Sequence, residues 1–355
     1  MHRSFAAIER KGKRRDVSDG LSVILPNYNH GHLILRALTA LARQQPDEII
    51  VVDDGSTDGS LALLQDFART VPITILRNTA NQGAVPALAR GLSAASGRYV
   101  YFAAADDYVM PGFFRRARDL LERHPAAGLF CGEALLIDGV TNRPVGMRPP
   151  VRPRRRAGFV DPARTRALLA RIDNWILTGS AVFRRDAIVA LGGLDARLGA
   201  FADGYLARKV ALTHGFCFAP ETVATWCVYR DSVSRQTALQ VAKAREMLDV
   251  LPQRIAADPA FPAWYAAAFA RRWRFAAARL ALEHPVDHEL LNVMGASSRL
   301  DRGVTRGIWR IARGRPAHLA TLAWLWLRLR PTSLVGLVST ALARRLERGT
   351  TRPQP

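Results

Sequence analysis

The sequence predicts an α/β fold in which helices flank a parallel sheet, followed by a helical C-terminal extension. The first observation is an alternation of short apolar runs with stretches of helical spacing between residues 21 and 122. The apolar runs are continuous, which is typical of parallel strands covered on both faces. The second observation is the composition after about residue 240, where Ala, Leu and Arg dominate a helical pattern.

The predicted strands and helices follow one another in order along this part of the chain. Short runs of β-branched and aromatic residues predict strands at 21–26, 47–54, 73–78 and 98–104. Apolar residues at helical spacing predict helices at 32–44, after residue 56, near 84–96 and at about 111–122. Ser56 or Asp58 is the expected cap of the second helix.

The net charge and the cysteine content limit which partners and which cellular compartment are expected. The 355 residues carry a formal net charge of +21, which favours nucleic acid, an anionic membrane face or phosphate-bearing substrates as partners. Three scattered cysteines without a CxxC pair favour a reducing compartment over a disulfide framework. The sequence shows no secretory signal and no uncharged apolar run of about 20 residues, so we expect a cytoplasmic location.

Polar side chains collect where the four predicted strands end. They are the stretch 26–29, the pair Asp53 and Asp54, the stretch 81–83, and the pair Asp106 and Asp107. Each loop alone fits an ordinary turn or helix cap, but parallel strands bring all four to one crevice. Paired carboxylates there would repel one another without a bound cation. The pattern therefore indicates Mg²⁺ or Mn²⁺ together with a nucleotide diphosphate.

Four motifs in this order resemble the inverting family-2 glycosyltransferases. They are SVILPNYNHGHLILRAL, EIIVVDDGSTDGS, NQGAVPALARGLSAASGRYVYFAAADD and YVMPGFF. The resemblance covers roughly residues 20 to 235. It implies a GT-A (Rossmann-like) fold with a mixed, mainly parallel sheet, and transfer of a sugar from a nucleotide diphosphate donor, most simply a UDP-sugar.

The resemblance and the composition together divide the chain into parts. They predict a basic disordered arm at 1–20, a GT-A catalytic domain at 21–238 and a helical, Arg-rich region at 239–355. The catalytic domain is divided into a nucleotide-sugar half at 21–138, an Arg/Pro-rich loop and connection at 139–173, and an acceptor half at 174–238. The Pro- and Arg-rich stretch 143–156 is expected to be a mobile loop outside the core, with its Arg run at 152–156 either solvated or clamping an acceptor phosphate.

The resemblance also implies which residues form the donor site. The aromatic side chain after the first strand would pack on the base, and Asp53 and Asp54 would bind uracil and ribose. Asp106 would be the main metal ligand and Asp107 a second, weaker one. The implied nucleotide-sugar-binding residues are Pro26, Tyr28, Asn29, Asp53, Asp54, Asn81, Gly83, Asp106, Gly179 and Ser180. The family has an Asp-x-Asp element whose last acid corresponds to Asp106, and the position of its first acid is Ala104 in this sequence. A second departure is Ala89, where many members have Asn.

The acceptor half is expected to supply the general base. The family takes it from an acidic pair at a helix start, shortly after a Gly-Gly-x-Asp turn, and here that pair reads Ala202-Asp203. Asp203 is therefore the predicted base, with a helix cap as the alternative. Many members carry a His near the diphosphate in a following segment, where Arg230 or Arg235 is the candidate contact in this chain.

The C-terminal region concentrates positive charge beside apolar helices. Residues 301–355 contain eleven Arg against Asp301 and Glu347, and they also contain Trp324 and Trp326. Such a tail suits the anionic cytoplasmic face of a membrane, with a lipid-linked or membrane-assembled acceptor. The alternative is a helical hairpin packed on the catalytic domain with a solvated Arg face.

Three functions remain in view. The leading one is a metal-dependent inverting hexosyltransferase that builds a polysaccharide or glycolipid of the cell envelope. A catalytically degenerate member that binds donor without turnover is the second, because Ala104 and Ala202 replace acids. A basic nucleic-acid-binding protein is the third, and the lack of aromatic-basic interleaving or a known module argues against nucleic acid as a partner.

Overall fold

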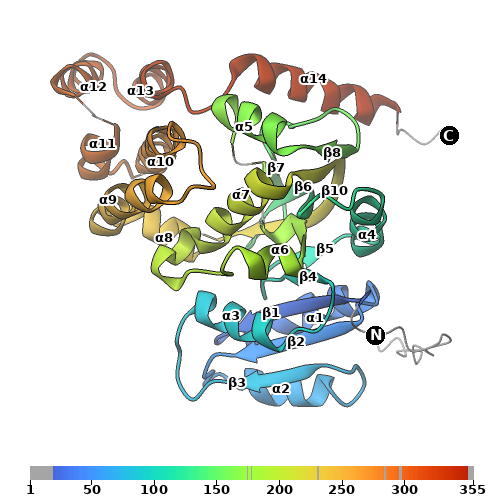
Figure 1. Ribbon diagram of the computed structural model, residues 1–355. Helices are drawn as coiled ribbons and strands as arrows, with labels where there is room; N and C mark the ends of the chain where they lie inside the picture. Colours follow the sequence, from blue (N-terminus) through green and yellow to red (C-terminus); the bar gives the residue numbers. More distant parts are fainter. Residues whose placement is uncertain are drawn as a thin grey trace.

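The computed structural model describes residues 19–350, except 174, 177, 230, 231, 284, 296 and 297. Most of the arm predicted at 1–20 therefore lies outside the described residues. The described part contains a sheet of ten strands in the order β3-β2-β1-β4-β9-β6-β10-β5, with β7 beside β6 and β8 beside β10 (Figure 1). The strands are β1 Leu21–Asn27, β2 Glu48–Asp53, β3 Thr74–Arg77, β4 Tyr99–Phe102, β5 Tyr108–Val109, β6 Leu129–Asp138, β7 Pro144–Arg148, β8 Gly158–Val160, β9 Ala181–Arg184 and β10 Phe216–Val228.

The sheet is mixed, with its longest ladders parallel. Strand β1 pairs in parallel with β2 and β4, β2 pairs in parallel with β3, and β6 pairs in parallel with β10. Short antiparallel ladders join β9 to β4 and β6, and β5 to β10. The four strands predicted before residue 105 are present, and the predicted fold class is confirmed.

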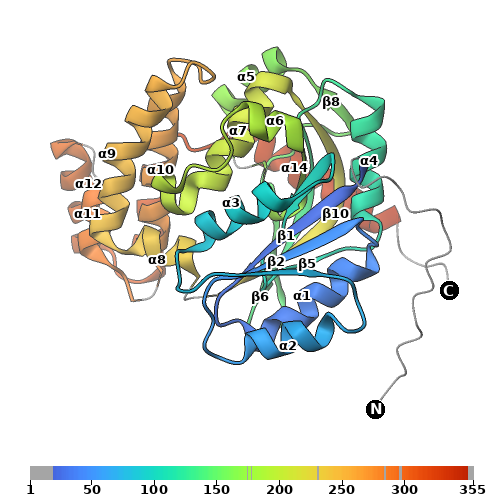
Figure 2. The same cartoon turned by 60° about the horizontal axis from the view of Figure 1, so that its bottom comes forward.

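Helices cover both faces of the sheet. They are α1 Gly31–Arg43, α2 Ser60–Phe67, α3 Ala84–Ala94, α4 Phe113–Arg123, α5 Pro162–Arg171, α6 Arg185–Ala190, α7 Ala202–His214, α8 Val233–Leu239, α9 Val241–Ala257, α10 Tyr265–Ala281, α11 His288–Gly295, α12 Arg299–Ile311, α13 Arg315–Leu329 and α14 Leu334–Thr350. Short 3-10 turns, η2 Thr178–Ser180 and η3 Ala196–Phe201, precede β9 and α7. Figure 2 shows α3 on one face of β1 and β2 and α1 with α2 on the other.

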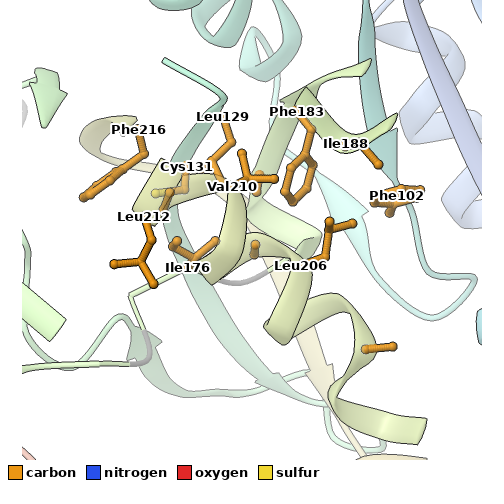
Figure 3. Close-up of a cluster of buried hydrophobic side chains, with 14 of the residues drawn as sticks. Phe102, Leu129, Cys131, Ile176, Phe183, Ile188, Leu206, Val210, Leu212 and Phe216 are labelled. Atoms are coloured by element: carbon orange, nitrogen blue, oxygen red, sulfur yellow. The ribbon is translucent and has the colours of Figure 1, made fainter. Parts of the chain in front are cut away.

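The buried core divides along the sheet as the pleat requires. Ile24 of β1 belongs to the cluster on the α3 and α7 face, whereas its neighbours Val23 and Leu25 belong to the cluster on the α1 and α4 face. Because side chains alternate along a strand, β1 has apolar side chains on both faces and so contributes to both clusters. Figure 3 shows Leu206 and Val210 of α7 among the side chains of the first cluster, which also contains Phe183.

The cap predicted for the second helix is wrong by one to three residues. Helix α2 begins at Ser60, and its N-cap is Gly59 with φ 84°. Asp58 instead lies in the preceding turn, where its carboxylate accepts hydrogen bonds from the backbone N–H groups of Ser60 and Gly31. This bond to Gly31 ties the loop to the first turn of α1, which a purely local capping argument does not anticipate.

The stretch 143–156 is more ordered than the sequence predicts. Its first part forms β7, which pairs antiparallel with β6. Pro144 is tolerated because it is the first residue of an edge strand. The second part is held by Arg152, whose side chain is 5% exposed and forms two hydrogen bonds to the carboxylate of Glu133, at 2.9 and 2.8 Å. The expectation of a mobile loop outside the core is therefore wrong, because a buried carboxylate on β6 captures the first arginine of the run.

The C-terminal region is helical, as predicted. A small separate core joins α9, α10, α11 and α13, whereas Leu251 and Tyr265 of α9 and α10 enter the cluster shared with α7. Helix α14 lies apart from the other C-terminal helices and runs back over the part of the sheet that holds β7 and β8 (Figure 1). Within the described residues, none of the helices combines the length and the apolar character needed to cross a bilayer.

Candidate functional site

The carboxyl ends of β1 and β2 place three buried polar side chains side by side. Asn27 is the register partner of Asp53, and Asp54 follows directly. All three are at most 2% exposed. The amide Nδ2 of Asn27 donates to Asp53 Oδ1 (3.1 Å) and to Ser56 Oγ (3.0 Å). Asn27 Oδ1 is buried and has no hydrogen-bond partner within the described part of the chain.

Asp54 organises the loop that follows β3. Its carboxylate accepts hydrogen bonds from Asn78 Nδ2 (2.6 Å), the Gln82 N–H (3.0 Å) and the Gly83 N–H (2.7 Å). Gly83 has φ 98° and caps α3, a backbone conformation that favours glycine. Asn81 is exposed, and its Oδ1 also accepts from the Gly83 N–H. The geometry gives Asp54 a positioning role, because the protein's own donors already occupy its carboxylate.

The loop after β1 presents an aromatic ring on a fixed backbone. Tyr28 is 41% exposed, and it follows Pro26, which is paired with Val52 inside the sheet. Asn29 has φ 55°; its N–H donates to Ser56 Oγ (3.1 Å), and its Oδ1 accepts from the Thr57 N–H (2.8 Å). These bonds tie the loop that carries Tyr28 to the turn after β2, which follows the buried Asp53 and Asp54.

The pair Asp106 and Asp107 lies just beyond β4. Asp107 Oδ1 accepts a hydrogen bond from the Cys227 N–H of β10 (2.7 Å). Burial and the neighbouring Asp106 carboxylate raise the pKa of Asp107 well above its ordinary value, against the opposing effects of the Cys227 N–H and the Arg36 charge. A second carboxyl group directly beside Asp107 makes this turn suited to a cation.

Arg36 is a site residue that the sequence reasoning missed. It projects from α1, and its Nη2 donates to the backbone carbonyl of Asp106 (2.7 Å). Its guanidinium lies over the Tyr108 ring, 5.2 Å from the centroid. The helical pattern predicts that Arg36 faces away from Ile34 and Leu38, which are buried. The pattern does not reveal that the Asp106 turn, 70 residues away, packs opposite that face.

The turn before β9 connects the two halves of the site. The Gly179 carbonyl accepts a hydrogen bond from the Tyr101 hydroxyl (3.0 Å), and a Cβ at Gly179 would lie 3.6 Å from Asp107 Oδ2. On its other side, Thr178 Oγ1 donates to Asp203 Oδ2 (2.7 Å). Ser180 is buried, and its hydroxyl donates to the Gly132 carbonyl of β6 (3.2 Å), which links the turn to the sheet. Residues 178 and 179 thus bridge the Asp106–Asp107 turn and Asp203.

Asp203 lies in the first turn of α7 and does not occupy the N-cap position, which belongs to Phe201. Its half-buried carboxylate accepts from Thr178 and from the adjacent Gly204 N–H (2.6 Å). The neighbouring Ala202 is 1% exposed and belongs to the main core. An acid at position 202 would be buried among apolar side chains in this fold, which gives a physical reason for the departure from the family pattern.

Of the two candidate arginines, the structure describes Arg235 alone. Arg230 lies outside the described residues. Arg235 of α8 forms an ion pair with Glu283, which follows α10. A diphosphate contact from either arginine stays a prediction, and the structure offers Arg36 as the guanidinium beside the carboxylate pair.

The donor set fits a divalent ion that shares its coordination with a substrate. The described residues contain no group of three or more His, Cys, Asp or Glu side chains able to hold a metal alone. Mg²⁺ and Mn²⁺ are commonly held by one or two carboxylates together with substrate phosphates. Asp106 and Asp107 supply two carboxylates, and burial together with the Asp106 charge raises the pKa of Asp107 although Arg36 is nearby.

The order of the strands, with polar residues at the carboxyl ends of β1 and β2 and just beyond β4, defines a GT-A fold. Two solved structures share that fold. TarS 1–349 of S. aureus in complex with UDP-GlcNAc has a TM-score of 0.58 at 15% identity, covering 88% of this chain and 93% of that one. The mannosyltransferase PcManGT of Pyrobaculum calidifontis, in complex with GDP-Man and Mn²⁺, has a TM-score of 0.57 at 21% identity, covering 91% and 86%.

Residues 22–188 match the family model described as Glycosyl transferase family 2, and this stretch is a family 2 domain. Among curated relatives, an uncharacterized glycosyltransferase of Escherichia coli, YibD, is 41% identical over 102 residues. That match covers 26% of this chain and 28% of YibD. The matches to the first four curated relatives span between 28% and 35% of those proteins.

Proposed function

We propose that this protein is a metal-dependent inverting glycosyltransferase that moves a hexosyl group from a UDP-sugar to a polysaccharide or lipid-linked acceptor. One observation carries the proposal: Thr178 donates a hydrogen bond to Asp203, and a Cβ at the next residue, Gly179, would lie 3.6 Å from Asp107 Oδ2, so one turn lies between the two sets of acids. A pair of acids suited to a diphosphate-bound cation is thereby joined to a separate carboxylate suited to proton transfer. The family match and the fold support this combination.

The nucleoside would occupy the edge formed by β1 and β2. The exposed Tyr28 ring gives the base a stacking surface. Asp53 would orient Asn27 by accepting from its Nδ2, and the two residues would form the floor beneath the uracil and ribose. Asp54 would shape the adjoining wall through the loop 78–83.

The diphosphate would lie beside the turn that carries Asp106. Asp106, with Asp107, would hold Mg²⁺ or Mn²⁺, which neutralises charge on the diphosphate leaving group when it is bound. Arg36 would add a fixed positive charge on the same side, because its guanidinium is already bonded to the Asp106 carbonyl.

Asp203 would act as the general base. Thr178 holds Oδ2 and the Gly204 N–H holds Oδ1, so the carboxylate has a fixed direction. The acceptor hydroxyl gives its proton to Asp203 as its oxygen bonds to the anomeric carbon from one face. The bond from that carbon to the phosphate oxygen breaks on the other face, so the configuration inverts and UDP leaves.

We place the reaction in the cytoplasm, on the inner face of the membrane, in the synthesis of a cell-envelope glycan. The net charge of +21 supports an anionic surface as partner. An acceptor carried on lipid would then be held near the enzyme.

Donor binding and turnover test this function separately. Isothermal titration of UDP should show tighter binding with Mn²⁺ present, and Asp106→Asn should remove that gain. A panel of UDP-sugars, followed by release of UDP, should then find one that is turned over. Asp203→Asn should keep UDP binding and lose turnover by roughly 10²- to 10⁴-fold.

Asp195→Asn is the matched control, because Asp195 lies at the start of η3 and pairs only with Arg197 among the groups described. Unchanged turnover in Asp203→Asn would remove the role of general base from Asp203. UDP binding without turnover of any donor by the unaltered protein would assign a donor-binding protein without this catalysis. Absence of any UDP binding, with or without metal, would exclude the whole proposal.

A further inference from the structure

Helix α14 has two faces of opposite character. One face exposes large apolar side chains over three turns, each between 54% and 80% exposed: Leu334, Val335, Val338, Leu342 and Leu346. At 3.6 residues per turn these positions form one continuous stripe. We call this stripe the α14 apolar face. Arg345 is exposed within it, and no acidic residue lies among these positions.

The opposite face is fixed to the catalytic domain by buried charges. Arg344 binds the Glu133 carboxylate and donates to the Pro149 carbonyl (2.7 Å). Arg152 bridges Glu133 to Glu347 at the end of the helix, with 2.6 Å between its Nη1 and Glu347 Oε1. The hydroxyl of Thr340 accepts from the Arg152 N–H (3.1 Å). Because this face is held in place, the apolar face stays directed away from the domain.

Exposed apolar side chains concentrate in the last three helices. Of the seventeen large apolar side chains that are exposed among the described residues, nine lie between residues 300 and 346. In Figure 1 the helices α12, α13 and α14 lie along one edge of the molecule, at the opposite end from β3 and α2. Clustering at one edge is typical of an interaction surface, whereas single exposed apolar residues are ordinary.

The charge of the same edge is strongly positive, because arginines far outnumber acidic residues there. The two acidic residues between 301 and 350 are both engaged, Asp301 with Arg328 and Glu347 with Arg152. The arginines that are exposed there are Arg306, Arg310, Arg313, Arg315, Arg328, Arg330 and Arg345. An apolar stripe flanked by arginines complements a surface with an anionic layer over an apolar one. A second copy of this chain, itself at +21, would be repelled.

We infer that the α14 apolar face docks into an anionic lipid membrane, with α14 lying in the plane of the interface and the arginines of α12 to α14 contacting lipid phosphates. This deepens the membrane location proposed above and rests on it, but it does not depend on the sugar-transfer chemistry. The buried Glu133 cluster fixes the orientation of the catalytic domain on that surface.

Vesicle sedimentation with the full chain tests this docking. Vesicles of phosphatidylcholine with phosphatidylglycerol should pellet the protein, and vesicles of phosphatidylcholine alone should pellet little. The double variant Val338→Glu, Leu342→Glu should weaken binding by about tenfold or more, since it replaces two apolar contacts with charges that anionic lipid repels. Val145→Glu, at a 58% exposed position on β7, is the matched control and should bind like the unaltered protein.

Two further readouts separate the causes of failure. The thermal shift caused by UDP and Mn²⁺ should be equal in the double variant and the unaltered protein, which shows that the fold and donor site are intact. Loss of the UDP response in both proteins, with vesicle binding kept, would reject the transferase and leave the docking in place. Equal vesicle binding by the double variant, or a dimer in light scattering that the variant abolishes, would overturn the docking.

Discussion

The two halves of the site are built by different means. In the nucleotide half, the ends of the adjacent strands β1 and β2 are joined by hydrogen bonds between short side chains, namely Asn27 with Asp53 and with Ser56. In the acceptor half, α7 is held by a buried network centred on Asp173. That carboxylate binds Arg208 of α7 (2.8 Å), Arg272 of α10 (3.4 Å) and the Tyr265 hydroxyl (2.8 Å).

The two halves differ in how far apart along the sequence the residues that hold them together lie. The nucleotide half depends on polar groups that parallel strands bring together by register. The acceptor half depends on arginines from two helices, about 35 and 100 residues from Asp173 along the chain. These arginines and Asp173 stabilise the fold only when they are buried together, because a buried charge without its partner is costly. Damage to the first half should therefore remain local, whereas damage to the second should affect the whole fold.

The largest effect is expected from Asp173→Asn. The change leaves Arg208 and Arg272 without their buried carboxylate, which should cost about 3–5 kcal/mol of unfolding free energy. Urea denaturation followed by circular dichroism measures this cost. Asp66→Asn is the control, because its pair with Arg69 is about 80% exposed and should contribute little. A cost below about 1 kcal/mol would mean that the network does not anchor α7.

Asp54→Ala should be intermediate and local. It leaves Asn78 Nδ2 and the N–H groups of Gln82 and Gly83 without their acceptor, a cost of about 1–3 kcal/mol. Hydrogen exchange should rise in residues 78–86 and stay unchanged in α7. UDP affinity should fall in parallel, measured by titration. Faster exchange throughout the molecule would contradict the local character assigned to the nucleotide half.

Arg36→Met should have a smaller effect, confined to ligand binding. The variant keeps an apolar stem near Tyr108 but loses the bond to the Asp106 carbonyl and the nearby positive charge. We expect UDP affinity in the presence of Mn²⁺ to fall about fivefold, equivalent to about 1 kcal/mol, with an unchanged melting temperature. Arg43→Met, in the last turn of the same helix, is the control. Identical affinities for the two variants would remove Arg36 from the site.

The smallest effect is expected in the pH dependence of the unfolding free energy, which adds a second test of the Asp173→Asn prediction. Burial alone would raise the pKa of Asp173, but Arg208 and Arg272 outweigh it and lower that pKa below its ordinary value. The network therefore stabilises the fold fully above the unfolded carboxyl pKa of about 4, and its contribution is lost as pH falls toward the folded pKa. The difference in unfolding free energy between the unaltered protein and Asp173→Asn should shrink below about pH 4. Denaturation series from pH 6 to pH 3 measure it, and a constant difference would contradict the lowered pKa.

The sequence predicted the fold class and the strand ends well because both depend on local patterns. Continuous apolar runs identified β1 and β2, and parallel register then brought the residues after them together. The stretch 143–156 was misjudged because its order comes from Glu133 and from α14, nearly 200 residues further along. The residue pattern within that stretch gives no indication of partners so distant in the sequence.

The site was predictable only in outline for the same reason. Asp53, Asp54 and Asp106 stand at strand ends, so topology alone placed them at one edge. Arg36 was missed because its contact depends on how the Asp106 turn packs against α1. The burial of Ala202 could not be predicted either, since it depends on helix packing against the sheet. The roles proposed for Asp106 and Asp203 remain predictions for the experiments above.

The shared core across residue 238 limits how this protein can be divided. Leu251 and Phe269 of the C-terminal helices occupy the same cluster as Val210 and Phe216 of the GT-A fold. A fragment ended at residue 238 would expose that apolar surface and strip Asp173 of Tyr265 and Arg272. The two parts of the protein are thus not separable at this boundary. Joining its C-terminal helices to another GT-A domain would require redesign of the shared apolar contacts on both sides.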